Sequence, residues 1–198
     1  MVVYHQIGLD LLQANAINYG LIPNELFSSE SNVQEVEMHN GVYKISKLAF
    51  YNCRCLERIS GATGVQVIDE GAFYRCRRLK DLEVGLKIPS VKIVDGYAFQ
   101  FCVSMTDVEF GEGLEQMEEF AFLNCYSLRR VAMPLKMDLI SDNIFKGCTS
   151  MANIELVGKT SSRWISPLRF MFRGATSQKD RNQNNAKAKS NGATLSRK

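Results

Sequence analysis

Apolar residues recur along this chain at fixed offsets from five phenylalanines. The phenylalanines stand 23, 26, 23 and 23 residues apart, and each is followed three positions later by a cysteine. They are Phe50, Phe73, Phe99, Phe122 and Phe145. Apolar residues also stand eight, five and one before each phenylalanine and six, nine and, except at Gly61, eleven after it. This period indicates one short structural unit stacked on copies of itself, each burying a face that it cannot bury alone.

The pattern extends one unit toward the N-terminus. Phe27 stands 23 residues before Phe50, and Glu30 replaces the cysteine of this unit. A terminal unit with one exposed face is expected to be more polar than the others. The sequence therefore predicts six repeats over residues 19–158, the first of them degenerate. The three extra residues of the 26-residue interval are expected around 88–90, in a surface loop, because Pro89 cannot donate to a strand ladder.

Each unit is expected to contain two short strands. The first lies seven to eleven residues after the phenylalanine, where apolar and charged residues alternate. The second lies eight to five residues before the phenylalanine, and a helical or 3₁₀ turn is expected over Ala-Phe-x-x-Cys. Stacking of the units then gives a parallel sheet that lines one face of a solenoid.

The repeated string resembles a known family. Residues 65–84 read Val-x-x-Ile-x-x-x-Ala-Phe-x-x-Cys-x-x-Leu-x-x-Leu-x-Val, which is similar to the BspA-type leucine-rich repeat, and the resemblance covers about 140 of the 198 residues. It implies a leucine-rich repeat solenoid of α+β or mostly β class, with one short parallel strand per repeat on the concave face. It also implies an adhesive or recognition surface, and it supplies no catalytic residues.

The two ends of the chain are predicted to differ from the repeats. Apolar residues at helical spacing predict an N-terminal capping helix over residues 1–18. Trp164, Leu168 and Phe172 have the same spacing, so residues 159–175 are predicted to form a C-terminal cap, with a basic amphipathic membrane or nucleic-acid segment as the alternative. Residues 176–198 are rich in Ser, Gln, Asn, Lys and Ala and are predicted to be disordered.

Charge divides the chain into an acidic body and a basic tail. Residues 159–198 contain ten Lys and Arg and one Asp, a net charge of +9, whereas residues 1–158 contain 14 bases and 20 acids, a net charge of −6. No apolar run is long enough to span a membrane, and residues 1–20 lack the basic start of a signal peptide. A cytoplasmic location is expected, with a nuclear one as the alternative.

Neither catalysis nor metal binding is expected. The cysteines are predicted to be reduced, with the five repeat cysteines buried as small hydrophobes. Cys53 and Cys55 form the one close cysteine pair, and a metal site would need two more ligands. The adjacent pairs 69–70 and 118–119 are acidic, but such side chains diverge in a turn and are interpreted as solvated. We therefore expect no enzyme activity, no cofactor and no small-molecule substrate.

The outward positions of the predicted concave sheet indicate a binding surface. These positions stand eight and ten residues after each phenylalanine, and the central ones are acidic. The residues predicted to bind a partner are Asp81, Glu83, Asp107, Glu109, Arg58 and Arg130. Like charges on strands about 4.8 Å apart destabilise a sheet. The sequence therefore predicts a protein partner with a basic patch, unless the flanking cations already screen the carboxylates.

The basic tail supports a competing function. A segment with a net charge of +9 is suited to a nucleic acid or an anionic membrane surface. The two functions use different parts of the chain, since the first depends on the repeats and the second on residues after 158.

Overall fold

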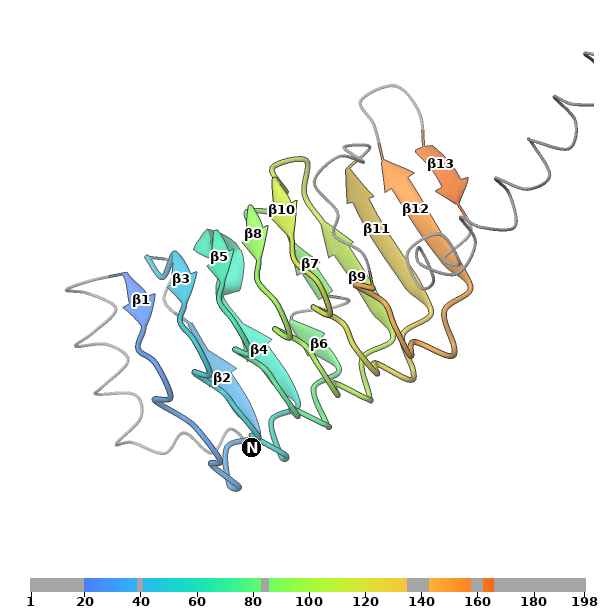
Figure 1. Ribbon diagram of the computed structural model, residues 1–198. Helices are drawn as coiled ribbons and strands as arrows, with labels where there is room; N and C mark the ends of the chain where they lie inside the picture. The colour runs from blue at the N-terminus through green and yellow to red at the C-terminus, as the bar shows by residue number, and fades with distance from the viewer. Residues whose placement is uncertain (1–19, 39–40, 83–85, 135–142, 158–161, 166–198) are drawn as a thin grey trace, which may run out of the picture.

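The computed structural model describes residues 20–38, 41–82, 86–134, 143–157 and 162–165. In this part of the chain, successive turns of backbone stack into a solenoid with parallel strands and almost no helix (Figure 1). In the described residues the turns contribute strands to two walls that enclose the core. The predicted fold class, a leucine-rich-type repeat solenoid, is confirmed.

One wall, here called the short-strand wall, is a parallel sheet of two-residue strands. In their spatial order the strands are β1 (Leu21–Ile22), β3 (Lys44–Ile45), β5 (Val67–Ile68), β8 (Ile93–Val94) and β10 (Gln116–Met117). Ile22 lies opposite Ile45, and Ile45 lies opposite Ile68. All three isoleucines are buried, because each stands five residues before the phenylalanine of its unit and points into the core.

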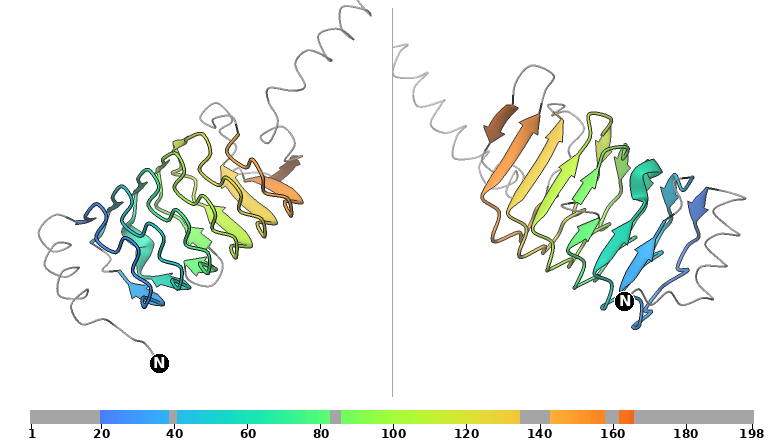
Figure 2. Two further views of the ribbon diagram at one scale, coloured as in Figure 1. Left: turned by 60° about the horizontal axis from the view of Figure 1, so that its bottom comes forward. Right: turned by 180° about the vertical axis from the view of Figure 1, so that it is seen from behind.

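The opposite wall, here called the long-strand wall, consists of two sheets (Figure 2). The first sheet contains β2 (Glu35–Glu37), β4 (Arg58–Ser60) and β6 (Asp81–Leu82). The second contains β7 (Leu86–Ile88), β9 (Asp107–Phe110), β11 (Arg130–Pro134), β12 (Asn153–Val157) and β13 (Ser162–Ile165). The strands before β13 are parallel, and all of them except β7 lie where the alternation of apolar and charged residues predicts them.

The three extra residues of the long interval do not lie where the sequence predicted. Ile88 was expected in a loop, but it belongs to β7, lies opposite Phe110 of β9 and is 1% exposed. The chain therefore departs from the repeat before β7, and residues 83–85 lie outside the described part. Leu82 with Val84 and Leu86 with Ile88 have the same apolar spacing. Strand pairing distinguishes their positions in the wall, because β6 pairs with β4 and β7 pairs with β9.

The Ala-Phe-x-x-Cys segment is a run of β-turns and not the helical turn that was expected. Backbone amides donate to the carbonyl three residues earlier, as from Cys53 to Phe50. The residues two before and two after each phenylalanine have positive φ, as at Leu48 (φ 55°) and Asn52 (φ 59°). Alternate left-handed residues prevent a helix from continuing. The one helix in the described residues is the 3₁₀ helix η1 (Ala62–Gly64).

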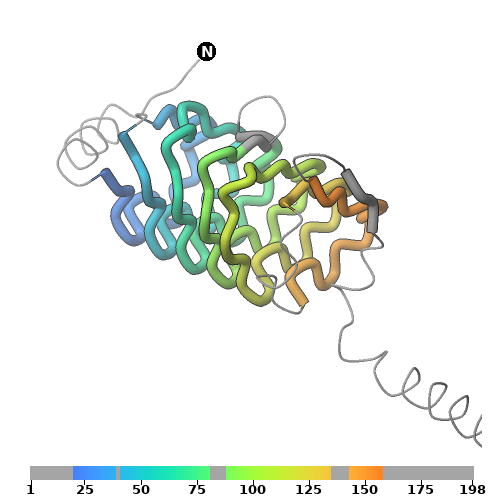
Figure 3. The backbone as a smooth tube through the Cα atoms, turned by 90° about the horizontal axis from the view of Figure 1, so that it is seen from above, coloured from blue at the N-terminus to red at the C-terminus, as the bar shows by residue number. Residues whose placement is uncertain are grey.

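Six phenylalanine rings form a ladder along the axis of the solenoid, whose turns are seen from above in Figure 3. Ring centroids of neighbouring units lie between 4.9 and 5.6 Å apart, and Phe27 of the degenerate first unit is part of the ladder. The backbone follows the same axis, since the Phe50 amide donates to the Ala72 carbonyl over 2.8 Å. Each unit is therefore joined to the next by side-chain and backbone contacts together.

The repeat cysteines are buried, as predicted. Cys53, Cys76, Cys102, Cys125 and Cys148 have no exposed surface, and all six cysteines of the chain are free thiols. Burial raises the pKa of the Cys53 thiol to about 12, and it also raises the pKa of Cys102. These thiols therefore stay protonated at neutral pH.

The two predicted caps of the solenoid are described only in part. Residues 1–18, expected to form a capping helix, lie outside the described residues. Within the predicted C-terminal cap, Trp164 was expected on a helix but belongs to β13, where it lies opposite Glu155 of the antiparallel neighbour β12. A strand occurs here because the edge of β12 offers backbone groups that β13 can pair. Residues 166–175 lie outside the described part of the chain.

Candidate functional site

The predicted concave surface corresponds to the outer side of the long-strand wall, here called the strand face. Along β9, Val108 and Phe110 point into the core and are buried, whereas Asp107 and Glu109 point outward and are half-buried. The same alternation continues along β12. The period of two therefore places on one surface those residues that were predicted to bind a partner and whose side chains are described.

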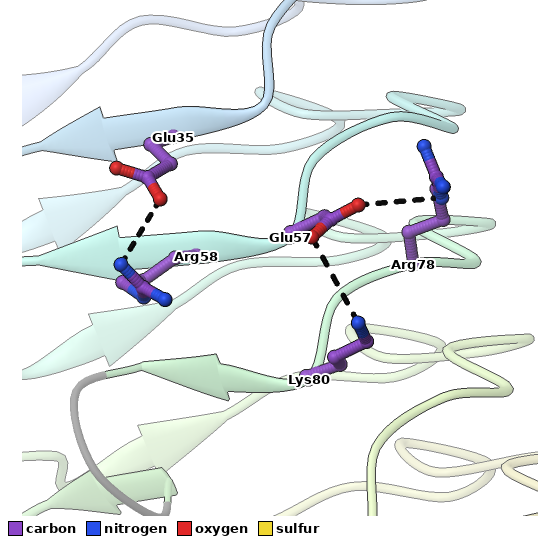
Figure 4. A network of polar contacts seen from close by, with 5 residues as sticks. All are labelled: Glu35, Glu57, Arg58, Arg78 and Lys80. Carbon is purple, nitrogen blue, oxygen red and sulfur yellow. Dashed lines mark hydrogen bonds and ion pairs between the residues drawn. The ribbon is translucent and has the colours of Figure 1, made fainter. Parts of the chain in front are cut away.

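Ion pairs cross between units in the N-terminal half of the strand face (Figure 4). Nη1 of Arg58 in β4 lies 3.0 Å from Oε1 of Glu35 in β2. Just before β4, Glu57 lies 3.4 Å from Arg78 and 3.8 Å from Lys80. All five side chains are at least 36% exposed. Each pair therefore contributes less than about 1 kcal/mol to stability, and a partner displaces these contacts at low cost.

Arg130 of β11 organises the C-terminal half of the strand face. Its Nη2 and Nε atoms lie 2.6 and 3.2 Å from Oε2 of Glu155 in β12. Its Nη1 atom lies 3.9 Å from Oε2 of Glu109 in β9. In the strand register Arg130 stands between Asp107 and Asn153. The guanidinium therefore screens carboxylates on both neighbouring strands, as the alternative interpretation of the sequence proposed.

Strand pairing on the strand face bears on the predicted stack of four carboxylates. Among the described residues β6 pairs with β4, so Asp81 lies opposite Arg58. Glu109 lies opposite Lys87 of β7, where the sequence pattern had placed Glu83. Glu83 and the side chain of Asp81 lie outside the described part. The displaced register brings a basic residue into a ladder expected to be acidic, and the role of these residues in binding stays a prediction.

A second group of carboxylates lies where the short strands end. These side chains stand three or four residues before the phenylalanines and surround a hollow of about 390 Å³, here called the acidic hollow. Its lining residues are Asp69, Glu70, Asp95, Glu118, Glu119, Lys47, Gly96, Tyr97 and Phe120. The rings of Tyr97 and Phe120 stack with their centroids 5.5 Å apart. Five acids therefore face one lysine beside an aromatic pair.

Asp69 and Asp95 meet across adjacent units and share a hydrogen bond. Burial raises the pKa of Asp95 to about 6, with further contributions from the hydrogen bond and the charge of Asp69. Burial also acts to raise the pKa of Asp69, but hydrogen bonds from Asp95 and Lys44 outweigh it and lower that pKa. The Lys44 ammonium lies 2.7 Å from Asp69. The two carboxyl groups therefore hold one proton between them up to about pH 6.

The sequence interpretation missed this pair because it compared acids that are adjacent in the chain. Adjacent residues such as Asp69 and Glu70 do not form the shared-proton contact. Asp69, Asp95 and Glu118 each stand four residues before a phenylalanine. That common offset was the available signal, since equivalent residues of stacked units lie about 4.8 Å apart.

Metal and membrane sites were also sought in the described residues. Within those ranges no three His, Cys, Asp or Glu side chains lie close enough together to hold a metal ion. No helix in the same ranges has the length and hydropathy needed to cross a membrane. The basic tail, on which nucleic-acid or membrane binding depends, lies outside the described residues after Ile165.

Comparison with protein families identifies the repeat. Residues 84–165 match the family model described as "BspA type Leucine rich repeat region (6 copies)". The match agrees with the stacked Phe ladder and the parallel strands of this region. Residues 84–165 therefore match BspA-type leucine-rich repeats, which confirms the resemblance recognised in the sequence. No curated protein matches the chain.

Solved bacterial structures share the fold. A leucine-rich repeat protein from Bacteroides ovatus is 28% identical, with a TM-score of 0.61 over 68% of this chain. A leucine-rich repeat protein from T. pallidum is 26% identical, with a TM-score of 0.56 over 61% of this chain. A leucine-rich cell surface protein from Faecalibacterium prausnitzii is 22% identical, with a TM-score of 0.51 over 74% of this chain, and shows the fold alone.

This chain corresponds to only part of each of these proteins. It covers 34% of the Bacteroides protein, 57% of the T. pallidum protein and 46% of the Faecalibacterium protein.

Proposed function

We propose that this protein is a non-catalytic scaffold that binds a protein partner through the strand face. Leucine-rich repeat proteins as a class support a protein-interaction role. The observation that carries the proposal is the position of Arg130 on the strand face. It lies between Glu109 and Glu155 on neighbouring strands, whose inward side chains are buried in the core. A rigid wall that holds charged groups at a fixed spacing is pre-organised for recognition, because little side-chain order is lost on binding.

The charge of the strand face supports a partner with a basic surface. Among the outward positions whose side chains the structure describes, five are acidic and two are basic. The acidic positions are Glu35, Glu37, Asp107, Glu109 and Glu155, and the basic ones are Arg58 and Arg130. A net acidic face with fixed arginines accelerates association with a basic partner and fixes its register. The cytoplasmic or nuclear location expected from the sequence stays a prediction.

Site-specific photo-crosslinking in the full chain tests this proposal. A photoreactive residue is placed at Ser60 of β4 and at Asn153 of β12, on the strand face, and at Gln116 of β10, on the short-strand wall. The two strand-face positions are expected to crosslink the same partner, identified by mass spectrometry. Equal crosslinking from Gln116 would contradict binding through the strand face.

A matched pair of charge variants then tests the named residues. Glu109→Gln is expected to weaken the crosslinked complex severalfold, because it removes a carboxylate beside Arg130. Glu115→Gln removes one exposed charge away from the strand face and serves as the control. Equal binding by the two variants would show that Glu109 has no role in the contact.

A further inference from the structure

The edge of the solenoid that follows the phenylalanines contains no carboxylate in five successive units. This edge, here called the turn edge, comprises the five residues after each phenylalanine. Its residues are 51–55, 74–78, 100–104, 123–127 and 146–150, and none of them is Asp or Glu. Its cations are Arg54, Arg75, Arg77, Arg78 and Lys146. The acidic hollow precedes the same phenylalanines, so the turn separates acidic from basic side chains.

Three arginines of the turn edge are not neutralised within the described part of the chain. Arg54, Arg75 and Arg77 form no ion pair there, whereas Arg58 and Arg130 on the strand face each contact a carboxylate. Arg54 Nε donates to the side-chain oxygen of Asn52 over 2.9 Å, a neutral acceptor. Arg54 and Arg77 are exposed, and both stand four residues after the phenylalanines of adjacent units. Two uncompensated guanidinium groups therefore occupy equivalent positions in neighbouring units.

The third arginine, Arg75, lies over two aromatic rings. The guanidinium carbon of Arg75 lies 5.3 Å from the ring centroid of Tyr74 and 5.7 Å from that of Phe101. Its Nε atom is buried and has no hydrogen-bond partner among the described residues. Contact with ring faces positions the cation and leaves its charge uncompensated.

We propose that the turn edge of the units of Phe50 and Phe73 is a second interaction surface, which binds an acidic peptide segment of a protein. The planar fork of arginine matches a carboxylate with two parallel hydrogen bonds. An extended peptide displays side chains on one side every second residue, about 6.6 Å apart. Flexible arginines on adjacent units reach such carboxylates in succession.

The aromatic residues favour a peptide over a single-stranded nucleic acid. Nucleic acids bound in this way need ring faces on which bases stack. Here the rings of Tyr51 and Tyr74 stack on one another with their centroids 5.3 Å apart. Tyr74 also meets Phe101 edge to face at 6.1 Å, and Arg75 lies over both rings. Tyr74 is therefore occupied within the protein and covers one face of Tyr51, so no continuous row of open rings is available and the main chemistry is that of the arginines.

This surface differs from the strand face in its charge, and Arg54 and Arg77 are not part of the strand face. The strand face is net acidic and suits a basic partner, whereas the turn edge contains five cations and no carboxylate. Failure of one proposal therefore leaves the other standing, and variants of Arg54 and Arg77 separate them from variants of Glu109.

Binding of fluorescein-labelled poly-L-glutamate to the full chain, followed by fluorescence anisotropy at physiological ionic strength, tests the proposal. Arg54→Gln combined with Arg77→Gln is expected to raise the Kd at least about tenfold, which corresponds to ~1.4 kcal/mol. The matched control, Lys187→Gln combined with Lys189→Gln, removes the same charge from the basic tail and is expected to change the Kd much less. Circular dichroism confirms that both variants fold.

A further variant separates geometry from charge. Arg54→Lys combined with Arg77→Lys keeps the charge and loses the planar fork, so it is expected to bind with intermediate affinity. Equal losses in the edge and tail variants, or no loss in the edge variant, would overturn the proposal. Tighter binding of single-stranded polyuridylate, lost in the same edge variant, would make the surface a nucleic-acid site instead.

Discussion

The thiol of Cys53 donates a hydrogen bond to the backbone carbonyl oxygen of Phe27, the phenylalanine of the preceding unit, over 2.8 Å. The same bond recurs between every successive pair of units, with lengths from 3.0 to 3.2 Å. The cysteine is thus more than a small hydrophobe, since it joins the ring ladder of one unit to the backbone of the unit before it.

Protection of these thiols leads to a labelling prediction. Burial raises the pKa of Cys53 and Cys102, so little thiolate is available to react. Native alkylation with iodoacetamide, read by mass spectrometry, is expected to modify the half-buried Cys55 first and the five repeat cysteines slowly. Labelling of Cys76, Cys102 and Cys125 as fast as Cys55 would show that the ladder is open in solution.

Position along the ladder determines the cost of losing a ring. Phe99 is fully buried and stacks on Phe73 and Phe122, whereas Phe27 is 7% exposed and stacks on Phe50 alone. Phe99→Ala is expected to lower the free energy of unfolding by about 3–5 kcal/mol, and Phe27→Ala by clearly less. Urea denaturation measures both values, and equal losses would contradict stacking as the source of stability.

Gly61, the one gap in the apolar pattern, is expected to resist substitution. Its φ is +71°, and a Cβ atom there would collide with the carbonyl oxygen of Met38. Gly61→Ala should therefore cost about 1–3 kcal/mol. Gly113→Ala is the matched control, because a Cβ at Gly113 meets nothing within 4 Å. Thermal denaturation compares the two, and a neutral Gly61→Ala would mean that the turn rearranges freely.

The shared proton of Asp69 and Asp95 predicts a pH dependence of stability. The pKa of Asp95 is raised from 3.8 to about 6 in the folded protein. Its contribution is therefore fully present below about pH 4 and is lost as the pH rises through 6. Asp95→Asn should remove this dependence. The difference in free energy of unfolding between the variant and the unsubstituted chain should therefore shift in favour of the variant as the pH rises from 4 to 7. Parallel denaturation curves of both proteins across this range would rule out the shared proton.

The repeat period was sufficient to predict the buried side of the molecule. The phenylalanine ladder, the buried cysteines and the strands other than β7 and β13 lie where their offsets placed them. These features depend on which residues of a short segment are apolar, and that information is local. Even the degenerate unit of Phe27 followed the rule, because its apolar positions are kept while its cysteine is not.

The contacts between units required the folded chain. Lys87 lies opposite Glu109 because β7, which lies outside the predicted strand positions, pairs with β9, whereas β6 pairs with β4. Asp69 and Asp95 meet for the same reason, since stacking brings together residues that are distant in the chain. Apolar periodicity specifies which side chains face the core. Strand register across an insertion depends on backbone hydrogen bonds between segments, and the sequence of a segment does not show which strand it will pair with.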